Sequence, residues 1–65
     1  MKLIVNGQTR DVSAATLAAL LRELDYEGNW LATALNGEVV PAKERPGCQL
    51  SEGDRIEILS PMKGG

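Results

Sequence analysis

A chain of 65 residues forms one domain with a small core, which leaves no volume for a deep substrate pocket and argues against a self-contained enzyme. The chain contains no histidine and one cysteine, so the usual groups for acid–base or nucleophilic catalysis and for a metal site are missing. A net charge of −2 with scattered Lys and Arg argues against nucleic acid or an anionic membrane as partner.

No export or membrane segment is expected, because the chain has neither a secretory apolar region nor a run of 18 apolar residues. This predicts a cytoplasmic protein whose single thiol, Cys48, stays reduced. Cys48 is expected to be incidental, with a persulfide partner or a redox switch as the alternatives. Lys43 and Arg45 are the only nearby groups able to lower its pKa.

The N-terminal residues predict a β-hairpin. Residues 1–5 alternate in hydrophobicity, as expected of a half-buried strand, and Ile4 falls on the face away from the core. Asn6-Gly7 follows, the dipeptide that most readily adopts the positive φ angles of a type I′ turn. Residues 8–12 then return antiparallel to the first strand.

The next segment predicts a helix over residues 17–24, because its leucines fall at positions 17, 20, 21 and 24, the spacing of one helical face. Thr16 is placed to act as the N-cap, accepting a free backbone N–H group of the first turn. Gly28 is expected to supply the left-handed residue that ends the helix.

A second hairpin follows, in which residues 31–35 alternate, Asn36-Gly37 repeats the type I′ signal and residues 38–40 return. Residues 42–49 have no apolar period and are expected to form a loop.

The remaining apolar residues complete the expected core. Leu50 is predicted to fill part of the core from the loop, and residues 51–54 read as a turn. The last strand covers residues 55–59, with Ile56 and Ile58 on one face.

The predicted fold class is therefore α+β, a ββαββ–loop–β roll in which one helix packs on one face of a mixed sheet. Residues 1–59 form the expected domain, and residues 60–65 form a flexible C-terminal tail in which Pro61 prevents further pairing as an interior strand. The tail ends in Gly64-Gly65.

The diglycine is the candidate reactive end. A carboxylate without a Cβ on either of its last two residues passes through a channel too narrow for other residues and adopts backbone angles closed to them. Six extended residues from Ser60 span at most about 20 Å, enough to carry Gly65 into a buried partner site. The alternative is a frayed or truncated terminus without a role.

Three parts of the chain carry a resemblance to a known family. They are residues 35–41 (LNGEVVP), residues 52–59 (EGDRIEIL) and residues 62–65 (MKGG). With the ββαββ order, they resemble the ubiquitin-like β-grasp fold and the ThiS family, the sulfur carriers of thiamin biosynthesis, over nearly the whole chain. The chain departs from the family where an Arg often follows the hairpin proline, because Ala42 follows Pro41 here.

The resemblance implies a sequence of steps at Gly65. A ThiF-type adenylating enzyme would use ATP to activate the Gly65 carboxylate, and sulfur would replace AMP to give a thiocarboxylate. A ThiG-type thiazole synthase would then receive that sulfur for thiazole formation, while Met62, Lys63 and Gly64 occupy the partner's channel. In this scheme the protein is a co-substrate rather than an enzyme, and it binds no cofactor or metal of its own.

The body is expected to contribute binding, because ordering the tail costs about 1–2 kcal/mol per residue in backbone entropy. Sequence period places four small or apolar residues on the sheet face opposite the helix, and exposed apolar clusters often mark interfaces. This predicted docking face consists of Ile4, Ala32, Ala34 and Leu59. Singly exposed apolar residues are also ordinary on protein surfaces, which is the alternative.

Two other functions remain open from the sequence. The small subunit of molybdopterin synthase uses the same thiocarboxylate, although that family is usually longer than this chain. A ubiquitin-like modifier would instead join its terminal glycine to lysines of other proteins, and a simple binding module would leave the diglycine unused.

Overall fold

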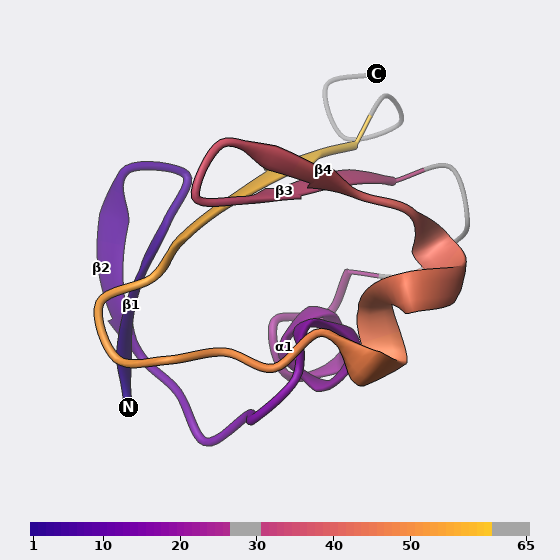
Figure 1. The fold of residues 1–65 in the computed structure, drawn as a ribbon. Helices are drawn as coiled ribbons and strands as arrows, with labels where there is room; N and C mark the ends of the chain where they lie inside the picture. The colour runs from indigo at the N-terminus through magenta and orange to yellow at the C-terminus, as the bar shows by residue number, and fades with distance from the viewer. Residues whose placement is uncertain (27–30, 61–65) are drawn as a thin grey trace.

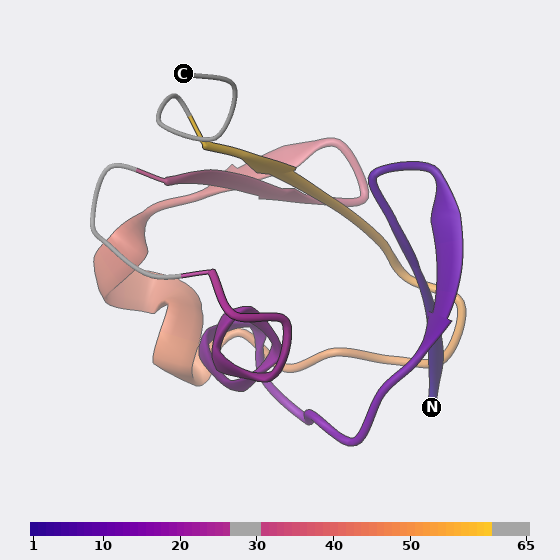
Figure 2. The same cartoon turned by 180° about the vertical axis from the view of Figure 1, so that it is seen from behind.

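The computed structural model describes residues 1–26 and 31–60, which fold as a curved five-stranded sheet around a helix (Figures 1 and 2). In chain order the elements are β1 (Lys2–Val5), β2 (Gln8–Asp11), α1 (Leu17–Glu23), β3 (Ala32–Leu35), β4 (Glu38–Val40), the 3₁₀ helix η1 (Ala42–Gly47) and β5 (Arg55–Leu59). The sheet order is β2-β1-β5-β3-β4. β1 and β5 run parallel and the other neighbours antiparallel, so the predicted mixed α+β sheet is confirmed.

Both predicted hairpins are present, and each turns on its Asn-Gly pair. The φ angles are 50° and 82° at Asn6 and Gly7, and 51° and 88° at Asn36 and Gly37. Positive φ at both central residues is the mark of a type I′ turn, whose twist matches that of the flanking strands. The turns therefore set the register of β1 with β2 and of β3 with β4.

The core lies between the concave face of the sheet and α1. Figure 1 looks down the axis of α1, with β1 and β2 on one side, β3, β4 and β5 above it, and η1 on the other side. The side chains that lose all contact with solvent are Leu3, Leu17, Leu20 and Ile56. Leu50 is also buried, as predicted. Within residues 1–26 and 31–60, no helix combines the length and apolar composition that crossing a bilayer requires.

The start of α1 agrees with the sequence, because the Thr16 Oγ1 atom accepts a hydrogen bond from the Ala19 N–H at 3.2 Å. The segment after η1 also holds this end of the helix. The Leu17 N–H donates to the Cys48 carbonyl and the Leu50 N–H donates to the Ala15 carbonyl, both at 2.9 Å. These bonds bring Leu50 under the helix.

The end of α1 differs from the prediction. Asp25, with φ of 65°, is the left-handed residue that follows the helix. The Asp25 N–H donates to the Arg22 carbonyl at 3.2 Å and the Tyr26 N–H to the Leu21 carbonyl at 2.8 Å, the pattern of a Schellman cap. The prediction that Gly28 ends the helix is therefore wrong, because Asp tolerates the left-handed conformation and takes that position earlier. Gly28 itself lies outside the described residues.

The loop predicted for residues 42–49 is also partly wrong, because residues 42–47 form η1. The Glu44 N–H donates to the Pro41 carbonyl at 2.9 Å and the Cys48 N–H to the Arg45 carbonyl at 3.2 Å, the three-residue spacing of a 3₁₀ helix. A 3₁₀ helix has three residues per turn, and the inward residue of η1 is the charged Arg45. The sequence of this segment therefore has no repeating apolar residue that would have predicted a helix.

Arg45 is the inward residue of η1 and is only 7% exposed. Its Nη2 donates to the Leu31 carbonyl at 2.6 Å and its Nε to the Thr33 Oγ1 at 3.1 Å. Thr33 in turn donates its hydroxyl proton to the Val40 carbonyl at 2.8 Å. Arg45 therefore joins η1 to both strands of the second hairpin.

Candidate functional site

The predicted reactive end lies outside the described residues, whereas the strand that leads to it is described. The tail residues that lie outside the described part are Met62, Lys63, Gly64 and Gly65. β5 ends at Leu59, and the next residue, Ser60, is the last that the structure describes. The base of the tail is thus the end of β5.

β5 is the central strand of the sheet, with β1 on one side and β3 on the other. Ile56 and Ile58 point into the core and are 0% and 4% exposed. β1 pairs with β5 at Arg55 and Ile56, and β3 pairs with it as far as Leu59. This pairing and the burial of alternate side chains hold the strand more firmly than an edge strand would be held. The position from which the tail starts is therefore set by the core.

Strand register brings three of the four predicted docking residues together. Ala32 lies opposite Leu59 on β5, and Ala34 lies opposite Val39 on β4. Leu59 is 69% and Val39 79% exposed, and these are the exposed large hydrophobic residues of the described chain. We call Ala32, Ala34, Val39 and Leu59 the outer patch.

Val39 is the member of the outer patch that the sequence interpretation missed. The signal was available, because the two-residue Asn36-Gly37 turn places Leu35 opposite Glu38 and therefore places Val39 opposite Ala34. Directly opposed residues share a face of the sheet.

Ile4 shares the outer face but stands apart from the outer patch. It is paired with Thr9 on β2 and with Arg55 on β5. Arg55 and Glu57 are the outward residues of β5 between Ile4 and Ala34, and both are exposed. The apolar surface is therefore interrupted by charges before it reaches Ile4, whose part in docking stays a prediction.

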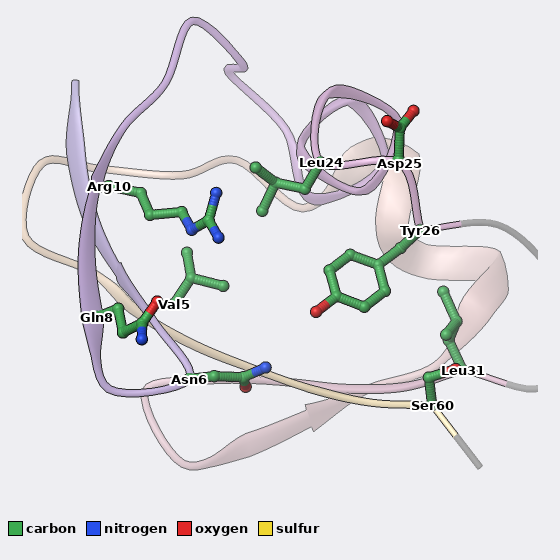
Figure 3. A pocket seen from close by; sticks show the side chains of 9 residues that line it. All are labelled: Val5, Asn6, Gln8, Arg10, Leu24, Asp25, Tyr26, Leu31 and Ser60. Atoms are coloured by element: carbon green, nitrogen blue, oxygen red, sulfur yellow. The ribbon is translucent and has the colours of Figure 1, made fainter. Parts of the chain in front are cut away.

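A cleft of about 470 Å³ lies on the opposite, helix-facing side, between the first hairpin and the end of α1. Figure 3 shows the Arg10 guanidinium and the Tyr26 hydroxyl directed into the cleft from opposite walls, with Val5 next to Arg10. Asn6 and Ser60 form part of its rim, so the cleft reaches the base of the tail. The sequence interpretation did not name these residues as a group, because β1, β2, the end of α1 and the end of β5 contribute them separately.

Cys48 follows η1 and is partly buried. Burial raises the pKa of the Cys48 thiol, and the carboxylates of Asp54 and Glu44 raise that pKa further. The Arg45 side chain is directed to β3 instead. The thiol is therefore protonated at neutral pH and a weak nucleophile. Among the described residues, no three His, Cys, Asp or Glu side chains gather as a metal site would require.

Comparisons with known proteins agree with this architecture. Residues 3–65 match the ThiS family. The sulfur carrier protein ThiS of Thermus thermophilus is 34% identical over 61 residues, which cover 94% of this chain and 95% of that protein. The crystal structure of the thiamine biosynthesis protein ThiS from Geobacter metallireducens has a TM-score of 0.82 at 32% identity, with 100% of both chains covered.

A longer relative shares the same segment. A thiazole synthase of Paramagnetospirillum magneticum is 38% identical over 66 residues, and the match covers 100% of this chain but 20% of that protein. The chain thus spans about one fifth of the length of this relative. The family match over residues 3–65 and the shared β-grasp fold together show that the chain belongs to the ThiS family, the sulfur carriers of thiamine biosynthesis.

Proposed function

We propose that Gly65 is the sulfur-carrying residue. Its carboxylate attacks the α-phosphate of ATP on a ThiF-type adenylating enzyme, which releases pyrophosphate and leaves an acyl adenylate. A reduced sulfur donor then displaces AMP, and the product is a Gly65 thiocarboxylate. ATP binds to the activating enzyme, and this chain is the protein co-substrate of that enzyme. The observation that carries the proposal is the family match, which extends through Gly64 and Gly65.

We further propose that a ThiG-type thiazole synthase receives the sulfur in the cytoplasm. The support is the Paramagnetospirillum magneticum relative, a protein named as a thiazole synthase in which one segment resembles this entire chain. Enzyme and carrier need to meet at a channel in the partner that admits only the tail, and Met62, Lys63 and Gly64 are the residues that would occupy this channel.

The experiment that tests this function is intact mass spectrometry before and after incubation with ATP, a ThiF-type enzyme and a sulfur donor. We expect a mass increase that equals one sulfur in place of one oxygen at Gly65. Addition of a ThiG-type enzyme and its substrates should then return the original mass and form the thiazole.

Other outcomes of the same experiment would contradict the proposal. Conjugates of higher mass, joined through lysines of other proteins, would indicate a ubiquitin-like modifier. Sulfur transfer only in the presence of a molybdopterin-synthase large subunit would indicate that the chain is the small subunit of that enzyme. Protein from the native host whose mass shows a chain clipped before Gly65 or extended beyond it would exclude the carrier chemistry altogether.

The outer patch is the part of the folded body that we propose docks the partner. Leu59→Glu places a charge within its exposed apolar surface, opposite Ala32. We expect KM for adenylation to rise about tenfold or more, since burying an unpaired charge at an interface costs more than the apolar contact that is lost. Stability should change by less than about 0.5 kcal/mol, because Leu59 is exposed.

Thr9→Glu is the matched control for Leu59→Glu. It adds the same charge on the same face of the sheet, but on the edge strand β2, away from the outer patch. Steady-state kinetics with both variants measure the difference. Equal KM values for the two variants would show that overall charge, not the outer patch, governs docking.

A further inference from the structure

The last part of β5 pairs with β3 but extends beyond β1, its neighbour on the other side. β1 is paired with β5 at Ile4↔Arg55 and Val5↔Ile56, and the chain then turns away at Asn6. The Asn6 N–H donates to the Ile56 carbonyl at 2.9 Å. Because backbone groups alternate in direction along a strand, those of Ile58 face the same side and have no strand residue opposite them.

The Asn6 side chain supplies the missing partner. Its Oδ1 accepts a hydrogen bond from the Ile58 N–H at 2.8 Å, and its Nδ2 donates to the Ile58 carbonyl at 3.2 Å. One side-chain amide thus satisfies both backbone groups of a residue that is 52 positions away in the sequence. Ile58 is 4% exposed, so these groups would otherwise be poorly solvated.

Asn36 makes the matching arrangement at the other end of β5. Its φ of 51° equals that of Asn6 within 1°. Its Oδ1 accepts from the Arg55 N–H at 2.9 Å, and its Nδ2 donates to the Asp54 Oδ1 at 3.0 Å. The two turn asparagines therefore hold opposite ends of one strand, and Asn6 holds the end next to the tail.

We propose that Asn6 is a positioning residue for the reaction at Gly65, and this inference rests on the proposed function. By fixing the backbone of Ile58, Asn6 determines where the chain becomes free and in which direction Ser60 leads it. Without this pair of hydrogen bonds, the end of β5 is held by β3 alone and its side toward β1 is left unpaired. Ser60 then leads the chain in a less defined direction, and this lost order must be restored before the carboxylate reaches the partner's active site.

Asn6→Gly tests the proposal, with Asn36→Gly as its matched control. Glycine adopts the required positive φ without strain, so each variant removes two side-chain hydrogen bonds and leaves its turn intact. We expect kcat for adenylation by a ThiF-type enzyme to fall about tenfold in Asn6→Gly, since a misplaced reacting group lowers the rate steeply. KM should stay within about twofold because β3 still pairs with β5 as far as Leu59 and so keeps the outer patch together. Asn36→Gly should keep both constants within about twofold of the parent.

Amide hydrogen exchange gives a second measurement, independent of the partner. The Ile58 N–H should exchange faster in Asn6→Gly and at the parental rate in Asn36→Gly, while amides of α1 remain equally protected in both. Asn6→Asp tolerates the same turn conformation and keeps an acceptor for the Ile58 N–H but has no donor for the Ile58 carbonyl. Its kcat should lie between those of the parent and Asn6→Gly, and it serves as the test variant if Asn6→Gly does not fold.

Three results would overturn the proposal. A parental kcat in Asn6→Gly would show that the tail does not depend on this clamp, and an equal fall in Asn36→Gly would show that only general stability matters. A parent protein that the ThiF-type enzyme does not adenylate would refute the proposed function and the positioning role with it.

Discussion

Removing Gly65, or replacing Gly64 with Val, should abolish adenylation and leave the domain folded. A missing terminal residue withdraws the carboxylate from the adenylating site by one residue length, about 3.5 Å. A branched side chain at Gly64 is expected to block the narrow channel that the diglycine enters. The core of residues 1–26 and 31–60 is formed between Leu3 and Ile58, and both changes leave these residues as they are.

Pyrophosphate release with a ThiF-type enzyme measures the adenylation rate, and circular dichroism measures folding. Gly47→Ala is the control substitution, because Gly47 lies on the body and a Cβ at this position would meet no other atom within 4 Å. It should be adenylated like the parent. Adenylation of either tail variant at the parental rate would contradict the channel explanation.

Arg45→Ala should lower the free energy of unfolding by about 2–4 kcal/mol, a large part of the stability of so small a domain. The substitution removes the hydrogen bonds to the Leu31 carbonyl and the Thr33 hydroxyl and leaves those groups without this partner. It also removes the aliphatic part of a side chain that is only 7% exposed. Urea denaturation followed by circular dichroism gives the measurement.

Lys43→Ala is the control for Arg45→Ala, since Lys43 lies in the same 3₁₀ helix but is exposed. Its effect should be below about 0.5 kcal/mol. Arg45→Lys should recover only part of the stability, because an ammonium group does not reproduce the planar fork that reaches two acceptors. Equal stability of Arg45→Ala and Lys43→Ala would show that the buried guanidinium does not hold η1 to β3.

Features with local signals were predicted correctly. The two Asn-Gly turns, the leucine face of α1 and the alternation along β5 each depend on residues close together in the chain. The role of the tail was also predicted from the sequence, since the Gly64-Gly65 motif can be identified without knowledge of the fold. Residues 61–65 lie outside the part that the structure describes, so their assigned roles are still predictions.

Features that depend on distant partners were missed or misplaced. η1 forms around Arg45, whose acceptors lie 12 and 14 residues away. Ile4 was found apart from the outer patch only once the order of the strands was known. Two local features were also missed, because Asp25 ends α1 earlier than Gly28 would and the Asn36-Gly37 turn places Val39 opposite Ala34.

The sequence by itself determined which residues form the hairpins and the helix, because backbone preference and hydrophobic period act over a few residues. The tertiary structure alone decided that β5 lies at the centre of the sheet and that Asn6 pairs with Ile58, 52 residues away. A side-chain amide can take the place of a strand residue only where folding brings it next to an unpaired backbone N–H and carbonyl group. No local sequence pattern indicates where such groups will be.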